Sequence, residues 1–373
     1  MKILLIGEYS NVHWTLAQGL RTLGHDVTVM SNGDFWKDYP RDIDVARRPG
    51  KLGGACLMLR LWSLLPRMRG YDVVQLINPI FFELSASRLF WFYRYLRRHN
   101  KKVILCALGM DYYWVSGCIE RKLLRYSDFN IGDRIRTDAT AERDRRDWTG
   151  TAKEQLNRMI AADCDGIVTG LYEYHACYQP LFPDKTQFIP MPIVPADADN
   201  DPTAIPTGQP LRLFIGISKG RSVYKGTDIM LRAAEDVAAR YPQQVLLNKA
   251  EGVPFNQYQH LMDTSDVLLD QLYSYTPAMN ALLAMSKGIV VVGGGEPENY
   301  EILGEQELRP IVNVLPSYDS VYHELEQLVM HPERIPELKR QSIAYVRRHH
   351  DYISVARRYV NFWQSITNNN KES

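Results

Sequence analysis

The sequence predicts an α/β protein made of two doubly wound, Rossmann-like parallel-sheet domains, and three observations lead to this. The chain has 373 residues, which is enough for two domains of ordinary size. Short apolar runs alternate with segments of helical periodicity across residues 2–108, and the same alternation begins again at residue 211. A Pro-, Asp- and Gly-rich stretch at 195–210 separates the two regions. Alternating strands and helices are typical of a parallel sheet covered on both faces.

In the first region, apolar residues at Val12, Leu16 and Leu20 have helical spacing, and Gly24 follows where the helix should end. Residues 128–155 differ, because arginines and acids alternate there with few apolar residues, and we expect a solvated loop or lid. We expect strands over 2–6, 26–30, 72–77, 103–108, 166–169 and 187–190, and helices over 12–23, 57–68 and 84–98.

In the second region, strands are expected over 211–217, 245–247, 267–269 and 289–292, with helices between them and from about residue 322 onward. The predicted domains are a first Rossmann-like domain over 1–195 and a second over 196–345. A C-terminal helix within 346–373 is expected to pack back on the first domain. Two doubly wound domains are expected to face each other across a cleft at the carboxyl ends of both sheets.

Composition excludes several classes of protein. There is no apolar stretch of membrane-spanning length, and the apolar run at residues 3–7 is too short for a signal peptide. The five cysteines are scattered without a CxxC pair, so we expect neither a metal site nor a disulfide framework, and a reducing, cytoplasmic location. Residues 1–195 carry 27 Lys and Arg against 21 Asp and Glu, whereas residues 196–373 carry 17 against 22. This imbalance favours an anionic partner for the first half, but it is too mild to predict nucleic-acid binding.

Three segments carry residue types that bind anionic ligands. After the first strand, Gly7 begins a turn into a helix, where backbone amides favour anions; an ordinary turn capped by Ser10 or Asn11 is the alternative. The single glycine does not fit a nicotinamide-binding fingerprint. The strand at 211–217 is followed by three cations on a Gly-rich turn, which suit a diphosphate leaving group; a solvated basic loop is the alternative. These residues are Gly216, Lys219, Gly220, Arg221, Lys225 and Gly226.

The third segment begins after the strand at 267–269. A helix is expected to open near Pro277, so that the amides of Met279 and Asn280 lie in its first turn and can bind phosphate. After the strand at 289–292, consecutive glycines allow a ligand to approach the backbone closely, or they simply form a tight turn. The residues of this segment that are expected to bind the ligand are Tyr275, Met279, Asn280, Gly294, Gly295 and Glu298.

The order and spacing of these motifs resemble the retaining GT-B glycosyltransferases of family 4, over nearly the whole chain. The resemblance implies the GT-B fold, a nucleoside diphosphate sugar as donor, and Arg221 and Lys225 on its diphosphate. The matching motifs are Gly7, Leu16-Ala17, Gly24-His25-Asp26-Val27-Thr28-Val29, Gly220-Arg221 with Lys225-Gly226, Ala284-Met285-Ser286-Lys287-Gly288, Gly294-Gly295-Glu296-Pro297-Glu298 and Ile189-Pro190-Met191-Pro192-Ile193.

The sequence also departs from the family's pattern. The family's pair of glutamates, separated by seven residues, falls on Tyr275 and Leu283, and a histidine common after the third strand is replaced by Asn78. The family's first-helix histidine aligns with Val12, although His13 lies beside it. A divergent subfamily that reads its donor through Asn280, Tyr275 and backbone amides fits these departures, and so does a protein that has lost part of its catalytic power.

Other residues are expected near the transferred sugar or the acceptor. Asp111 follows a strand that should end at the cleft, where a carboxylate orients an acceptor hydroxyl or stabilises oxocarbenium charge; a helix cap is the alternative. The remaining candidates are Glu8, Tyr9, Ser10, His13 and Asn78. Residues 88–102 hold six cations, five aromatic residues and no acid. Such a helix suits the anionic inner surface of a membrane, but more often its aromatic residues pack inward.

We therefore expect a metal-independent hexosyltransferase that uses no cofactor beyond its nucleotide-sugar substrate. It would transfer the sugar to a glycan or lipid-linked acceptor, with retention, in surface polysaccharide or glycoconjugate synthesis. Two alternatives remain open: a non-catalytic protein that binds sugar nucleotides or glycans, and a sugar-nucleotide epimerase of the same fold.

Overall fold

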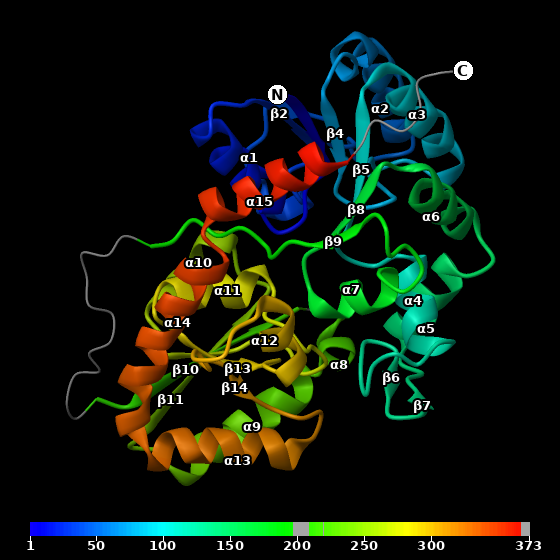
Figure 1. Ribbon diagram of the computed structural model, residues 1–373. Coiled ribbons are helices and arrows are strands. Elements are labelled where there is room, and N and C mark those ends of the chain that lie inside the picture. Colours follow the sequence, from blue (N-terminus) through cyan, green and yellow to red (C-terminus); the bar gives the residue numbers. More distant parts are fainter. Residues whose placement is uncertain (197–208, 219, 367–373) are drawn as a thin grey trace. The chain divides into compact units, whose positions relative to one another are not determined.

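The chain folds into two compact units, each built on its own parallel sheet (Figure 1). The computed structural model describes residues 1–196, 209–218 and 220–366. Most of the expected linker, and the candidate Lys219, lie outside these residues.

The boundaries of the two units do not follow a single cut in the sequence. The first unit contains Met1–Gly117, Asp144–Pro192 and the described residues from Tyr352 onward, and the second contains Cys118–Arg143 and the described part of Ile193–Asp351. The chain therefore passes from one unit to the other four times. The segment Cys118–Arg143, called the strap below, groups with the second unit although it lies inside the first region of the sequence.

The first unit contains a seven-stranded sheet in the order β3-β2-β1-β4-β5-β8-β9, with parallel pairing throughout. Four consecutive β1 residues, Ile3 to Ile6, are fully buried, so helices cover both faces of the sheet. Its elements are β1 (Lys2–Ile6), α1 (Val12–Thr22), β2 (Asp26–Ser31), η1 (Phe35–Lys37), β3 (Ile43–Asp44), α2 (Gly53–Ser63), η2 (Leu65–Met68), β4 (Val73–Leu76), α3 (Ala86–His99), β5 (Lys102–Ala107), most of α4 (Tyr112–Ile119), half of α5 (Ala139–Trp148), α6 (Ala152–Asp163), β8 (Gly166–Thr169), α7 (Tyr172–Tyr178), β9 (Thr186–Phe188) and α15 (Tyr352–Ser365).

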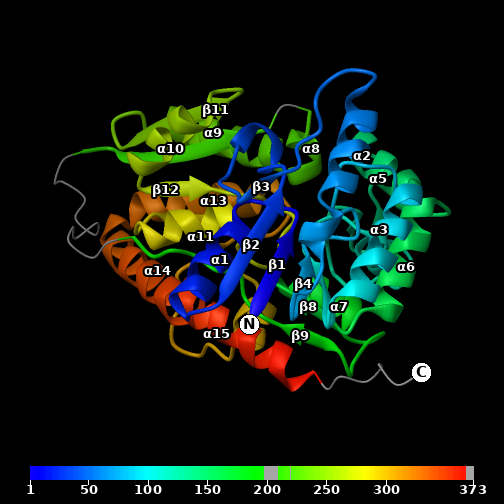
Figure 2. The same ribbon diagram turned by 90° about the horizontal axis from the view of Figure 1, so that it is seen from above.

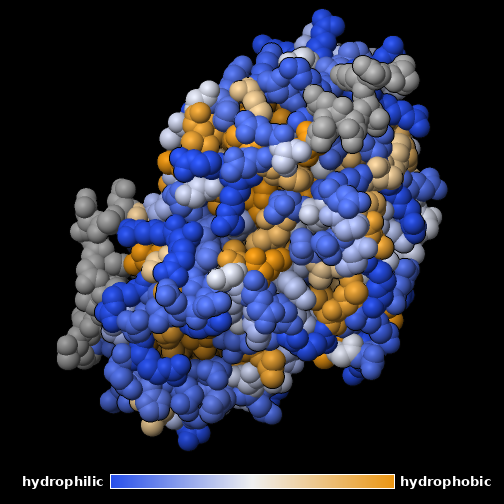
Figure 3. Space-filling model, viewed as in Figure 1, coloured by the Kyte–Doolittle hydropathy of each residue, from blue (hydrophilic) through white to orange (hydrophobic). Residues whose placement is uncertain are grey.

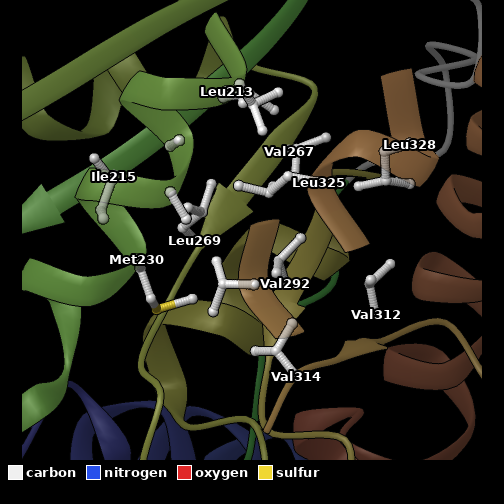
Figure 4. Packing of buried hydrophobic residues seen from close by; sticks show 14 of the residues in the cluster. Leu213, Ile215, Met230, Val267, Leu269, Val292, Val312, Val314, Leu325 and Leu328 are labelled. Atoms are coloured by element: carbon white, nitrogen blue, oxygen red, sulfur yellow. The ribbon is translucent and has the colours of Figure 1, made fainter. Parts of the chain in front are cut away.

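The second unit contains a five-stranded parallel sheet in the order β11-β10-β12-β13-β14. Alternate residues of its strands point to one face and meet α9 and α13 in an apolar core, shown in Figure 4. Its elements are β6 (Asn130–Ile131), β7 (Arg134–Ile135), β10 (Leu211–Ile217), α8 (Ser222–Lys225), α9 (Thr227–Arg240), β11 (Val245–Glu251), α10 (Phe255–Asp263), β12 (Val267–Leu269), α11 (Met279–Ser286), β13 (Val290–Gly293), α12 (Pro297–Leu303), β14 (Val312–Asn313), α13 (Tyr318–Met330), η3 (Pro332–Arg334) and α14 (Ile335–His349).

The predicted alternation of strands and helices is confirmed in both regions, but the prediction of a solvated loop over 128–155 is wrong. That stretch contains the β6–β7 hairpin, α5 and the beginning of α6. Its charged residues do not prevent folding, because many of them bind partners within the same unit, as Arg136 does. The short strands β3 and β14 have only two residues each and carry too little pattern to be predicted.

The last helix, α15, packs against α1, and the two lie side by side in Figures 1 and 2. The contact is close at Gly19, where an added Cβ would lie 2.3 Å from the carbonyl oxygen of Tyr352 and 2.9 Å from the Cβ of Ala356. Both helices belong to the first unit, so the end of the described chain completes the helical layer that begins with α1.

On the face in Figure 3, hydrophilic side chains cover most of the surface, and hydrophobic residues form separate patches between them. Among the described residues, none of the helices combines the length and apolar character that crossing a bilayer requires.

The close contact between α1 and α15 gives a first prediction. Gly19→Ala should destabilise the protein by about 1–3 kcal/mol, because the new methyl group overlaps the α15 backbone. Gly54→Ala is the matched control, because an added Cβ there meets nothing closer than 3.7 Å, and alanine is the better helix former. Urea unfolding of both variants tests this, and equal stability of the two would contradict the packing described.

Candidate functional site

Each doubly wound sheet has one place where the chain reverses its direction of winding, and ligands of such folds bind at the carboxyl ends of the strands there. In the first unit this point lies between β1 and β4, and in the second unit it lies between β10 and β12. We call them the first and second switch points. The predicted site residues divide between them: the acceptor candidates follow β1 and β4, and the predicted cations follow β10.

At the first switch point, the turn after β1 is held by buried polar contacts. Gly7 has a φ of +85°, and an added Cβ would lie 2.3 Å from the Cγ2 of Ile77, so only glycine fits. The carboxylate of Glu8 accepts the backbone N–H groups of His13, at 3.2 Å, and Trp14, at 2.9 Å. Glu8 therefore caps α1, a role that the alternative interpretation of this turn gave to Ser10 or Asn11.

His13 is fully buried below this turn. Its Nδ1 lies 2.8 Å from the carbonyl oxygen of Gly7 and therefore donates, which leaves Nε2 to accept from the Gln75 amide at 3.2 Å. Burial lowers the pKa of His13 to about 4, so the imidazole is neutral at pH 7. Burial also raises the pKa of Glu8 to about 8 despite the backbone hydrogen bonds that oppose the rise.

The other candidates near this point are also engaged in structural contacts. The Asn78 amide donates to the carbonyl oxygen of Met110 at 3.1 Å, and its side-chain oxygen accepts from the N–H of Ile80. Ser10 donates its N–H to Asp34 and accepts a hydrogen bond from Lys37. An added Cβ at Gly109 would lie 3.3 Å from the ring of Tyr9, so Tyr9 lies against the turn that follows β5.

Asp111 is fully buried at the beginning of α4. One carboxylate oxygen accepts the N–H of Trp114 at 2.8 Å, and the other accepts the hydroxyl of Tyr178 at 2.7 Å. Burial raises the pKa of Asp111 to about 6. In this structure the carboxylate holds the first turn of α4, which is the role of a helix cap.

At the second switch point, the turn after β10 places Arg221 and Lys225 at either end of α8. The Arg221 guanidinium lies 5.2 Å from the ring centre of Tyr224, and Arg221 is exposed. Gly226 has a φ of +72° and begins α9, and the N–H of Leu272 donates to the carbonyl oxygen of Lys225 at 3.0 Å. The turn after β10 is therefore fastened to the segment that follows β12.

A polar cluster lies at the end of β12. The Asn280 amide is 3.3 Å from a carboxylate oxygen of Asp270, and the Tyr258 hydroxyl donates to the Asn280 side-chain oxygen at 3.2 Å. Burial raises the pKa of Asp270, and the charge of Lys225 offsets part of that rise. At Gly216, an added Cβ would lie 2.6 Å from the Tyr258 ring. Gly216 and Asn280 therefore both lie against Tyr258, and the charge of Lys225 acts on the neighbouring Asp270.

The glycines after β13 serve close packing. An added Cβ at Gly294 would lie 2.1 Å from the carbonyl oxygen of Ser274, and one at Gly295 would lie 2.8 Å from Ile311. Packing against Ser274 and Ile311 therefore explains these two glycines, and the approach of a ligand to their backbone stays a prediction. Helix α11 begins at Met279, two residues after the expected start near Pro277, and the Met279 side chain is buried.

The strap adds residues that were not predicted, and Arg136 is the first of them. Its guanidinium donates to the carbonyl oxygens of Val223, at 2.7 Å, and Tyr224, at 2.9 Å, near the end of α8. It also lies 3.9 Å from the ring centre of Tyr273. Its side chain is only 8% exposed. Because these carbonyls belong to the turn that carries Arg221 and Lys225, Arg136 fixes the backbone of that turn.

A second group in the strap surrounds Tyr275, which stands where the family pattern has its first glutamate. Arg125 donates its backbone N–H to the Tyr275 hydroxyl at 2.7 Å and forms ion pairs with Glu296 and Glu298. The Tyr126 ring lies 4.8 Å from that of Tyr275, and its hydroxyl donates to Glu296. Tyr275 is 1% exposed. Two candidate donor contacts, Tyr275 and Glu298, are therefore partners of the strap in this structure.

Comparison with solved structures identifies the fold. The chain resembles Anabaena HepE in complex with UDP and glucose (TM-score 0.58, 11% identity, 98% of this chain and 100% of that chain covered). It also resembles sucrose-phosphate synthase from Thermosynechococcus elongatus (0.59, 11%, 98% of each chain). A putative UDP-N-acetylglucosamine 2-epimerase from Listeria monocytogenes is similar as well (0.54, 11%, 96% and 95%). No protein-family model matches the chain, and no curated protein matches its sequence.

At such low identity the likeness concerns the fold alone. The predicted GT-B architecture, two Rossmann-like domains with parallel sheets, is confirmed by these structures and by the two sheets described above.

The raised pKa of Glu8 predicts how a substitution depends on pH. A buried carboxyl whose pKa rises from 4.5 to about 8 on folding stabilises the fold below its unfolded pKa, and this contribution is lost as pH rises through about 8. The stability of Glu8→Gln relative to wild type should therefore increase as the pH rises from about 5 to about 9. Thermal unfolding at several pH values measures this, with the exposed Glu235→Gln as control. A difference that does not change with pH would show that Glu8 is ionised throughout.

The contacts of Arg136 predict the effect of a substitution that keeps the charge. Arg136→Lys should lose about 2–4 kcal/mol of stability, because an ammonium cannot reproduce the forked hydrogen bonds to two carbonyls. Arg134→Lys, at an exposed position two residues earlier, should change stability little. Denaturant unfolding compares the two variants, and equal stability would rule out an anchoring role for Arg136.

Proposed function

We propose that the protein is a glycosyltransferase that takes a hexose from a nucleoside diphosphate sugar and binds the donor's diphosphate at the second switch point. The observation that carries the proposal is the position of Arg221 and Lys225. Both lie on the turn after β10, where a GT-B domain offers the carboxyl ends of β10 and β12 to a ligand. The HepE structure contains UDP and glucose within the same fold, which favours a uridine nucleotide.

Two cations on one turn suit a diphosphate that gains charge as the glycosidic bond breaks. Arg221 binds phosphate oxygens through its fork, and Lys225 adds a point charge. Because Arg136 and the N–H of Leu272 already hold this turn, its donors need little reorganisation when the leaving group forms. The proposed reaction retains the configuration at the anomeric carbon and uses no metal or further cofactor. The acceptor is a glycan or lipid-linked sugar, in surface polysaccharide or glycoconjugate synthesis.

One other function has a specific observation in its favour. The fold is also similar to that of a putative UDP-N-acetylglucosamine 2-epimerase. In addition, Tyr275 and Leu283 stand where the transferase family that the sequence resembles has its glutamate pair. An epimerase would convert the donor without any acceptor, and a non-catalytic protein would bind the nucleotide without turnover. Screening nucleoside diphosphates for thermal stabilisation, followed by donor consumption with and without an acceptor panel, separates the three.

The proposal predicts the effect of removing each cation. Arg221→Ala and Lys225→Ala should each slow sugar transfer by roughly 30- to 1000-fold, the equivalent of about 2–4 kcal/mol of transition-state stabilisation. Arg347→Ala, an exposed arginine on α14 of the same unit, is the control. Initial rates at saturating and limiting donor provide the measurement. If both variants transferred the sugar at the wild-type rate, neither residue would belong to the donor site.

A further inference from the structure

Helix α2 has an apolar face that remains on the surface of the first unit. Helical spacing places Leu57 and Leu61 on its inward face, and both are buried. The opposite face is mostly apolar: Ala55, Cys56, Leu59 and Trp62 lie on it together with Ser63, and Leu52 directly precedes the helix. All six residues are exposed, and Leu52, Leu59 and Trp62 are 75%, 67% and 55% exposed. A helix apolar on both faces, with one face in water, indicates a binding surface.

The charge around this face is positive. Residues 45–71 contain six cations and no Asp or Glu. Arg48, Lys51, Arg67 and Arg69 are exposed on either side of the helix in sequence. The nearest acids recorded belong to other segments: Asp44 lies 3.9 Å from Arg60, and Glu83 accepts the backbone N–H of Arg47. The cations are Arg47, Arg48, Lys51, Arg60, Arg67 and Arg69.

The neighbouring helix α3, which carries the membrane contact expected at 88–102, is less suited to this role. Arg97 pairs with Asp163 and Asp165, Lys101 pairs with Asp72, and Lys102 donates to a backbone carbonyl of α15. Half of the six cations of residues 88–102 are thus engaged within the first unit. Among the aromatic residues of α3, Phe92 and Tyr93 are buried, Phe90 and Tyr95 are half-buried, and Trp91 is exposed. Helix α2 lies beside α3 in both ribbon views (Figures 1 and 2).

Charge decides between the two obvious occupants of the α2 face. A second copy of the chain, related by a twofold axis, would bring the same six cations against their counterparts, and like charges oppose such an interface. An anionic lipid surface can bind both the cations and the apolar face. The cations contact the headgroups, while the Leu and Trp side chains enter the boundary between headgroups and acyl chains.

We propose that the outward face of α2, with the cations of residues 45–71, docks the protein on an anionic lipid bilayer. The helix lies in the plane of the interface with Leu52, Leu59 and Trp62 inserted. This docking is independent of the donor site, because it involves a different face of a different unit and no residue of either switch point.

Cosedimentation of the full chain with lipid vesicles tests the proposal. Wild-type protein should bind vesicles containing roughly one-third phosphatidylglycerol far better than phosphatidylcholine alone, and salt should weaken the binding. Leu59→Glu with Trp62→Glu should lower the partition coefficient by about tenfold or more. Leu181→Glu, at an exposed apolar residue of the same unit, is the control and should bind as wild type does.

A charge variant gives an independent test that leaves the apolar face intact. Arg48→Gln, Lys51→Gln and Arg67→Gln together should lower binding by roughly fivefold per cation removed. Substituting glutamine for three exposed arginines elsewhere in the unit, Arg145, Arg357 and Arg358, should lower vesicle binding much less. Circular dichroism verifies that each variant is folded.

Three results would overturn the proposal. The first is failure of the wild type to bind anionic vesicles, and the second is wild-type binding by both α2 variants. The third is a wild-type protein that does not bind vesicles but forms a concentration-dependent dimer in light scattering, where Leu59→Glu with Trp62→Glu abolishes the dimer. That result would assign the face to self-association.

Discussion

A parallel sheet must be buried on both faces, and the arrangement of polar groups in this molecule follows from that constraint. The central strands carry continuous apolar runs such as Ile3 to Ile6, so charged chemistry is confined to the turns at the strand ends. Right-handed crossovers then bring the turns after β10 and β12 to one edge of their sheet. The fastening of Lys225 to Leu272 is a direct result, and the candidate diphosphate site depends on it.

The same constraint gives the two switch points different chemical characters. At the first, Glu8, His13 and Asn78 are buried and use their polar atoms on the protein itself. At the second, Arg221 lies on the surface of its turn and keeps its guanidinium at an aromatic ring. Buried polar groups that are hydrogen-bonded within the protein organise a turn, whereas an exposed cation such as Arg221 can contact a ligand. We therefore place the candidate chemistry at the second switch point.

Much of the fold could be predicted because strands and helices reveal themselves through periodicity. Strand β1 and helix α1 are examples, and so is α11, which begins at Met279, two residues after its expected start. The strap could not be predicted, because its contacts join residues far apart in the sequence: Arg125 binds Glu298, and Arg136 binds carbonyls of α8. Its alternating arginines and acids have the composition of a solvated loop. For the glycines after β13 the sequence allowed either the close approach of a ligand or a tight turn, but only the packing of Ser274 and Ile311 explains why side chains are excluded there.

The four passages of the chain between the units determine the order in which the protein is completed during synthesis. The sheet of the first unit can form once β9 has left the ribosome, but α1 waits for α15, the last helix, to cover Gly19. The strap is made before any strand of the second sheet exists, so Arg136 can meet Asp138 within the strap but not the carbonyls of α8, and Arg125 lacks Glu298 until α12 is translated. Domain-by-domain folding on the ribosome is therefore incomplete for the second unit until α14 is translated and for the first unit until α15 is translated. No single cut in the sequence yields either unit whole.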